Sequence, residues 1–322
     1  MLVAEITRGE LNPLARRYDS TVGLAEAMDL AGNALSEKVR DIRKVIESYV
    51  LECLQNYGVS FSHTWVFGTE AVRRLRAKSL GDYNSLTEGF DVTSTFRSPS
   101  SKAPGRLNFI LLEEKDEAYY SLAASIRSLP GIILEGDSVL AIDQGAGSVE
   151  LAIGRLNGGR IEHTSHKTYA LGTTVLASEL RRHRGDCDKL YEWVMGRIER
   201  RATRGAKSAK HTVILGSAIT MLARVVIRRR SGTSLTDRYS PKEVHGHQLT
   251  LDEMEHHIHD QRWGMELHPR DIASGEIATV LAGLVGLHTL LTVQQKRAFV
   301  VCAEALRFGI AWELASAASP DR

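Results

Sequence analysis

One segment constrains this chain more than any other: an apolar strand that ends in an acid and turns back through small residues. Residues 139–142 are apolar, Asp143 follows them, and residues 149–153 read as a returning strand. Between the strands lie a glutamine and a Gly-x-Gly-Ser turn. Alternation of this kind around a short turn predicts a β-hairpin.

The turn offers a site for a phosphate and for a cation. Small residues let backbone N–H groups approach a phosphate without an intervening side chain. An acid at a strand end can hold Mg²⁺ directly or through water, and Glu150 on the returning strand could position a metal or a water. The alternative is a tight hairpin with a surface acid.

The rest of the chain alternates between strand and helix patterns in both halves, which predicts an α/β protein with two lobes. Strands are expected near 2–6, 11–17, 63–67, 108–112 and 211–215. Helices are expected after Ser36, over 115–128 and over 186–201, with Thr250 and Glu253 capping another. Residues 83–105 are rich in Ser, Thr and Pro and predict a loop, and the region beyond Pro269 reads as almost entirely helical.

Composition favours a globular protein of the cytoplasm. The chain has 322 residues, 43% of them hydrophobic and 25% charged, with a net charge of +2. Three distant cysteines predict reduced thiols, and no signal peptide is apparent. The longest apolar stretch, 277–291, is short for a membrane span and favours a core helix.

Several further motifs follow in order along the chain. They are Gly68-Thr69-Glu70-Ala71-Val72-Arg73, Glu113-Glu114-Lys115-Asp116-Glu117-Ala118, Leu171-Gly172, Leu215-Gly216-Ser217-Ala218, Arg270-Asp271-Ile272-Ala273-Ser274-Gly275 and Ala305-Leu306-Arg307-Phe308-Gly309. Together with residues 143–150, this series resembles the exopolyphosphatase/guanosine pentaphosphatase (Ppx/GppA) family in its short two-domain form. The resemblance covers nearly the whole chain.

The resemblance implies two actin/hexokinase-like (ribonuclease H-like) lobes, with mixed sheets flanked by helices and the active site in the cleft between them. The first lobe would comprise residues 1–106 plus a C-terminal helix at about 303–322, and the second, carrying the hairpin, residues 107–302. A sugar or acetate kinase of the same superfamily fits less well, because Glu117 and the late helical motifs follow the phosphatase pattern.

The resemblance also implies the roles of individual residues. Glu117 would be the catalytic base, and Asp143 and Glu150 would hold Mg²⁺, with Glu150 also placing the attacking water. The phosphate-binding residues would be Arg73, Gly145, Ala146, Gly147, Ser148, Gly216 and Ser217. On sequence alone, a solvated helix acid and a surface cation are the ordinary interpretations of Glu117 and Arg73.

The implied activity is Mg²⁺-dependent hydrolysis of the terminal phosphoanhydride of polyphosphate or of guanosine pentaphosphate, releasing orthophosphate. The resemblance allows a homodimer and implies no membrane and no specific nucleic acid as partners. The alternative is a degenerate homologue that binds polyphosphate or a phosphorylated nucleotide without turnover.

Departures from the family pattern motivate that alternative. Ala146 replaces a glycine, Val149 and Ala218 replace hydroxylated residues, and Glu113-Glu114 stand where Ser-Gly is usual. The chain also begins after the point where the family has its first strand and first phosphate loop.

Basic and histidine-rich segments carry less weight. Six cations between Arg197 and Lys210, and the run Arg228-Arg229-Arg230, suit either a polyanionic partner or a solvated surface. The histidine groups, His245/His247 and His256/His257/His259, are expected to be structural rather than metal ligands.

Overall fold

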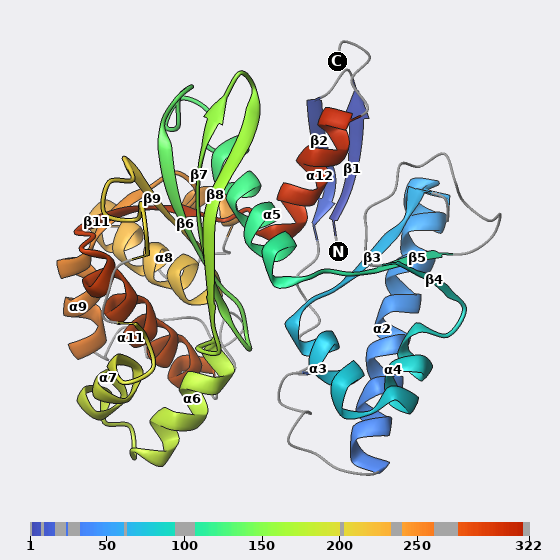
Figure 1. The fold of residues 1–322 in the computed structure, drawn as a ribbon, viewed down its shortest axis with the longest axis horizontal. Coiled ribbons are helices and arrows are strands. Elements are labelled where there is room, and N and C mark those ends of the chain that lie inside the picture. Colours follow the sequence, from blue (N-terminus) through green and yellow to red (C-terminus); the bar gives the residue numbers. More distant parts are fainter. Residues whose placement is uncertain are drawn as a thin grey trace. The chain divides into compact units, whose positions relative to one another are not determined.

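The computed structural model describes residues 2–7, 10–16, 24, 33–60, 63–93, 107–199, 203–232, 240–260 and 276–317. The chain forms two compact units, Met1–Glu117 with Ala315–Arg322, and Ala118–Leu314. The boundary follows Glu117 rather than residue 106, because the strand at 107–111 pairs within the first unit. Each unit combines sheets with helices (Figure 1).

The first unit contains two sheets. Strands β1 (Leu2–Thr7) and β2 (Glu10–Arg16) form an antiparallel pair, and β3 (Trp65–Gly68), β5 (Leu107–Leu111) and β4 (Phe90–Thr93) form a parallel sheet with β5 in the middle. Helices α2 (Asn33–Tyr57), α3 (Glu70–Lys78) and α4 (Leu80–Thr87) belong to this unit.

The core of the first unit joins these helices to the parallel sheet. Leu35 and Val39 of α2, Leu75 of α3 and Leu86 of α4 are buried in one cluster with Phe109 of β5. Gly68 allows β3 to lie close to β5, because a Cβ there would come within 2.9 Å of the Phe109 ring. The end of β3 and the start of α3 are thereby held against β5.

The second unit is built on a six-stranded mixed sheet with the order β10-β11-β9-β6-β7-β8. Its strands are β6 (Ser138–Gln144), β7 (Val149–Asn157), β8 (Arg160–Tyr169), β9 (His211–Gly216), β10 (Gln248–Thr250) and β11 (Ala298–Cys302). The β6–β7 and β7–β8 pairs are antiparallel hairpins, whereas β6, β9 and β11 are parallel.

One face of this sheet packs on a helical layer that forms the main core. The helices are α6 (Thr173–Arg182), α7 (Cys187–Met195), α8 (Ser217–Ser231), α9 (Leu251–His259) and α11 (Glu276–Gln294). Alternate β6 residues, Leu140 and Ile142, point into that core. The opposite face is covered by α5 (Glu114–Arg127), whose Leu122 comes close to Gly154 of β7. Helix α12 (Leu306–Ala317) packs on α5 at Gly309, where a Cβ would overlap Tyr120.

Helix α11 is central to this unit. Within the described residues, it alone is long and apolar enough to cross a membrane, but 67% of its 18-residue window is buried inside the protein. Gly283 and Gly286 let it approach Ala218 and Leu176 closely. These contacts fit the expected core helix.

Most expected elements are present, and some are not. The fold class is confirmed as α/β, and the hairpin, the β9–α8 unit and the Thr250–Glu253 capping box are observed. Two expectations were wrong. The end of α4 and the whole of β4 fall in the expected loop 83–105, and β11 interrupts the expected helical region. Helix α2 begins at Asn33, so Ser36 is inside it; its hydroxyl binds Asp82 at 2.7 Å.

Candidate active site

The β6–β7 hairpin places two carboxylates side by side. Asp143 of β6 and Glu150 of β7 are direct partners in the antiparallel register, so both side chains project from one face of the sheet. Like charges directly opposite each other are unfavourable unless something neutralises them. No ion pair between Asp143 and a cationic side chain is found among the described residues.

Burial and a serine define the environment of Asp143. The buried Ser121 of α5 donates a hydrogen bond to Asp143 Oδ2 at 2.5 Å. Burial raises the pKa of Asp143 above its ordinary value, and the bond from Ser121 offsets only part of that effect. A bound cation would relieve this penalty.

The same row of the sheet ends in a threonine. Glu150 pairs in register with Thr168 of β8, and Asp143 pairs on its other side with Leu215 of β9. The Thr168 hydroxyl is buried and has no hydrogen-bond partner within the described chain. Ser148 donates to Glu150, so oxygen atoms of Asp143, Glu150, Ser148 and Thr168 gather at the turn end of the hairpin.

The turn of the hairpin is held from behind by the start of α6. Thr173 N donates to Gly145 O at 3.0 Å, Thr174 N to Ala146 O at 3.0 Å and Gly172 N to Gly147 O at 3.2 Å. The carbonyl groups of the turn are therefore directed toward α6. A Cβ on Gly172 would lie 2.2 Å from Ala146 O, so this close approach requires glycine.

The N–H groups of the turn are left available. The N–H group of Gly145 donates to Ser148 O at 2.9 Å. The N–H groups of Ala146, Gly147 and Ser148 have no partner in the described part of the chain. Consecutive N–H groups without partners form a nest that suits an anion. Ala146 does not adopt positive φ, so the turn accepts alanine at the family's glycine position.

The β9–α8 junction lies beside the hairpin. Gly216 pairs with Gln144 in the β6–β9 register and has a φ of +121°. A Cβ at this position would lie only 2.6 Å from Gln144 O, so both the conformation and the space require glycine. Ser217 then begins α8, whose free N-terminal N–H groups favour anions. Gly216 therefore lies beside Gln144, the residue before the hairpin turn, and Ser217 follows it.

Two of the substituted family positions face the core. Val149 is fully buried among apolar side chains. Ala218 packs against Gly283 of α11, where an added Cβ would lie 2.8 Å from the Ala218 Cβ. A hydroxyl at either position would lie in the core layer. Their replacement therefore changes packing more than the phosphate-binding surface.

The first unit holds the other two predicted residues, Arg73 and Glu117, in contact with each other. Arg73 Nη1 donates to Leu112 O at 2.6 Å and forms an ion pair with the buried Glu117. Arg73 Nη2 is buried and has no partner among the described residues. The guanidinium is therefore fixed on one side and retains a donor for an anion.

Helix α5 carries two residues that contact predicted site residues. Glu117 and Ser121 are four residues apart on this helix, so their side chains lie on one face of it. Ser121 contacts Asp143, and Glu117 contacts Arg73. Sequence reasoning missed Ser121 and Thr168, because neither stands in a recognisable motif and only tertiary pairing brings them to the site.

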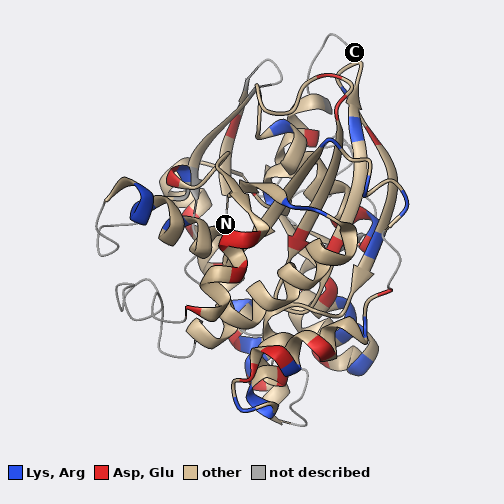
Figure 2. Ribbon diagram, turned by 90° about the vertical axis from the view of Figure 1, so that its left-hand side faces the viewer, with Lys and Arg blue, Asp and Glu red and all other residues tan. Residues whose placement is uncertain are grey.

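Each arginine of the run 228–230 lies near an acid. Arg228 bonds Glu243 at 2.8 Å, Arg229 lies 3.7 Å from Asp260, and Arg230 pairs with Glu253. Figure 2 shows acidic and basic segments interspersed along the chain. Arg200 and Arg201 of the other basic run, and the motif at 270–275, lie outside the described residues.

His245 is held by backbone groups on both sides. Its Nδ1 accepts from Ala303 N at 3.2 Å, and its Nε2 lies 2.6 Å from Ser128 O, which it can reach as a donor. His257 Nδ1 lies 2.8 Å from Glu253 O. No group of three or more His, Cys, Asp or Glu side chains with metal-binding geometry occurs among the described residues.

No protein-family model matches this sequence, and no curated protein matches it. Several solved structures do match this chain. An exopolyphosphatase from Cytophaga hutchinsonii has 16% identity and a TM-score of 0.71, covering 98% of this chain and 94% of the other. The Aquifex aeolicus member of the Ppx/GppA family has 19% identity and a TM-score of 0.63. The match covers 97% of this chain and 92% of the other.

An exopolyphosphatase-like protein has 14% identity and a TM-score of 0.64, again covering 97% and 92%. At such identities the likeness concerns the fold. Over nearly its whole length the chain has the fold of Ppx/GppA proteins, and the resemblance inferred from the motifs is confirmed at that level.

Proposed function

We propose that this chain is a cytoplasmic, Mg²⁺-dependent phosphohydrolase that removes the terminal phosphoryl group of polyphosphate or guanosine pentaphosphate. The observation that carries the proposal is the hairpin turn, whose three successive N–H groups lie beside an opposed carboxylate pair. An anion nest next to a cation site suits a phosphate–metal complex. The three free cysteines agree with a reducing compartment.

The residues present fit Mg²⁺. This ion takes oxygen ligands, commonly one or two carboxylates with waters and substrate phosphates completing its shell, so a three-residue protein cluster is unnecessary. Asp143 and Glu150 would hold it, with Ser121 orienting Asp143 and Thr168 available to its hydration shell. When bound, the ion would neutralise charge on the phosphate oxygens.

The chain's own residues would then align water with phosphorus. The turn N–H groups would bind phosphoryl oxygens, and Arg73 Nη2 would donate to an anionic oxygen of the substrate. Water attacks phosphorus, the bridging P–O bond breaks, and Glu117 accepts the water proton. The contact with Arg73 positions the Glu117 carboxylate for that role.

The degenerate-homologue alternative is weakened at three positions. Ala146 leaves the turn conformation unstrained, and Val149 and Ala218 lie in the core. Binding without turnover would support that alternative.

The test is orthophosphate release from polyphosphate and, separately, from guanosine pentaphosphate with Mg²⁺. Glu117→Gln keeps the shape of the side chain and removes its basicity, so we expect release to fall by about 10²–10⁴-fold. Glu114→Gln changes an exposed acid in the same first turn and should stay within about twofold of the wild type.

Equal rates for Glu117→Gln and the wild type would refute the assigned base. The substrate that shows the larger Glu117-dependent rate identifies which of the two activities the chain has.

A further inference from the structure

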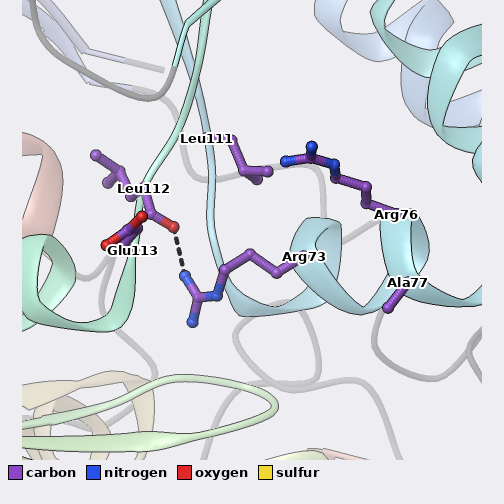
Figure 3. A pocket seen from close by; sticks show the side chains of 6 residues that line it. All are labelled: Arg73, Arg76, Ala77, Leu111, Leu112 and Glu113. Carbon is purple, nitrogen blue, oxygen red and sulfur yellow. Dashed lines mark hydrogen bonds between the residues drawn. The ribbon is translucent and has the colours of Figure 1, made fainter.

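Helix α3 presents a second arginine to the pocket that contains Arg73. The pocket, about 380 Å³ in volume, is lined by Arg73, Arg76, Ala77, Leu111, Leu112 and Glu113. In Figure 3 both arginine side chains extend from α3 toward Leu111, the last residue of β5, and Leu112, which follows it. Residues three apart on a helix are neighbours on its surface, about 5–6 Å apart at Cβ.

Arg76 differs from the nearby Arg74 in having no acidic side chain as an ion-pair partner. Arg74 pairs with Glu70 at 3.5 Å, whereas Arg76 has no ion pair with any described residue. Its guanidinium instead lies 5.7 Å from the centre of the Tyr83 ring. The aromatic contact supports the side chain of Arg76, which is exposed and lines the pocket.

The pocket carries a net positive charge. Its one acid, Glu113, is paired with Lys115 at 3.5 Å. Arg73 contributes a buried Nη2 donor without a partner among the described residues, held in place by Leu112 O. Two arginines with free donors at neighbouring positions on one helix suit two neighbouring anionic groups.

We propose that Arg76 binds the phosphoryl group adjacent to the one on Arg73, so that the pocket selects ligands with at least two linked phosphates. The inference rests on the proposed role of Arg73 as a phosphate-binding residue. Arg73 recognises a single phosphate, and Arg76 adds affinity only when a second one is attached.

The test is calorimetric binding of orthophosphate and of tripolyphosphate to the full chain. Arg76→Ala and Arg76→Gln should each weaken tripolyphosphate binding by about tenfold, the loss typical of one charge-assisted contact, and leave orthophosphate affinity within about twofold. Arg74→Ala removes a cation from the same helix and should leave both affinities within about twofold.

The inference is overturned if both Arg76 variants bind tripolyphosphate as tightly as the wild type does. It is equally overturned if their affinities for orthophosphate and tripolyphosphate fall by the same factor. It is also overturned if Arg74→Ala matches Arg76→Ala, because the effect would then be general charge. A wild type that binds neither ligand would contradict the proposed function as well, whereas a wild type that binds both, with unaffected Arg76 variants, would contradict this inference alone.

Discussion

At the scale of single residues, the site is a row of side chains across three strands. Asp143, Glu150 and Thr168 are consecutive register partners, so their side chains project from the same face. The sequence contains the two acids in a motif, and both were predicted. Thr168 lies in a strand without a motif, so only the register of β7 with β8 reveals it.

Thr168→Val should separate a ligand role from a structural one. The replacement keeps the shape and removes a buried hydroxyl without a described partner, so metal-free stability should be unchanged or rise by about 1 kcal/mol. Mg²⁺ affinity, measured by calorimetry, should fall by about tenfold or more. Thr168→Ser should restore it, and a metal-free loss of stability with unchanged Mg²⁺ affinity would contradict the assignment.

At the scale of elements, the start of α6 holds the turn of the hairpin, and the β9–α8 junction pairs with the end of β6. The sequence predicted the hairpin and the β9–α8 junction, since apolar strands ending in glycine carry strong local signals. It could not predict that N–H groups at the start of α6 donate to the turn carbonyls, because Leu171-Gly172 indicates only a loop. Helix α4 and β4 were missed because polar residues in 83–105 outweighed short apolar segments such as Leu86 and Phe90.

Gly172→Ala should displace the turn. A Cβ there meets Ala146 O at 2.2 Å, so the backbone must move, at a cost of about 1–3 kcal/mol in unfolding free energy. Phosphate release should fall because the nest loses its geometry. Gly81→Ala, where a Cβ meets nothing within 4 Å, should affect neither stability nor release by a comparable amount in denaturant titration and rate assays.

At the scale of the whole molecule, the candidate residues are divided between the two units. The first unit holds Arg73 and Glu117 on α3 and the start of α5, and the second holds the hairpin and the β9–α8 junction. The exact boundary escaped prediction, because the pairing of β5 with β3 and β4 has no sequence signal that distinguishes it from pairing in the other sheet.

The central claim is that the carboxylate pair and the turn together support Mg²⁺-dependent phosphoryl hydrolysis. The most direct measurement is the rate of orthophosphate release from polyphosphate and guanosine pentaphosphate across a Mg²⁺ titration, for the wild type and Asp143→Asn. We expect wild-type release to require Mg²⁺, and Asp143→Asn to lose about 10²-fold or more at every concentration. Release that is independent of Mg²⁺, or equal in Asp143→Asn, or absent from the wild type with both substrates, would contradict the account.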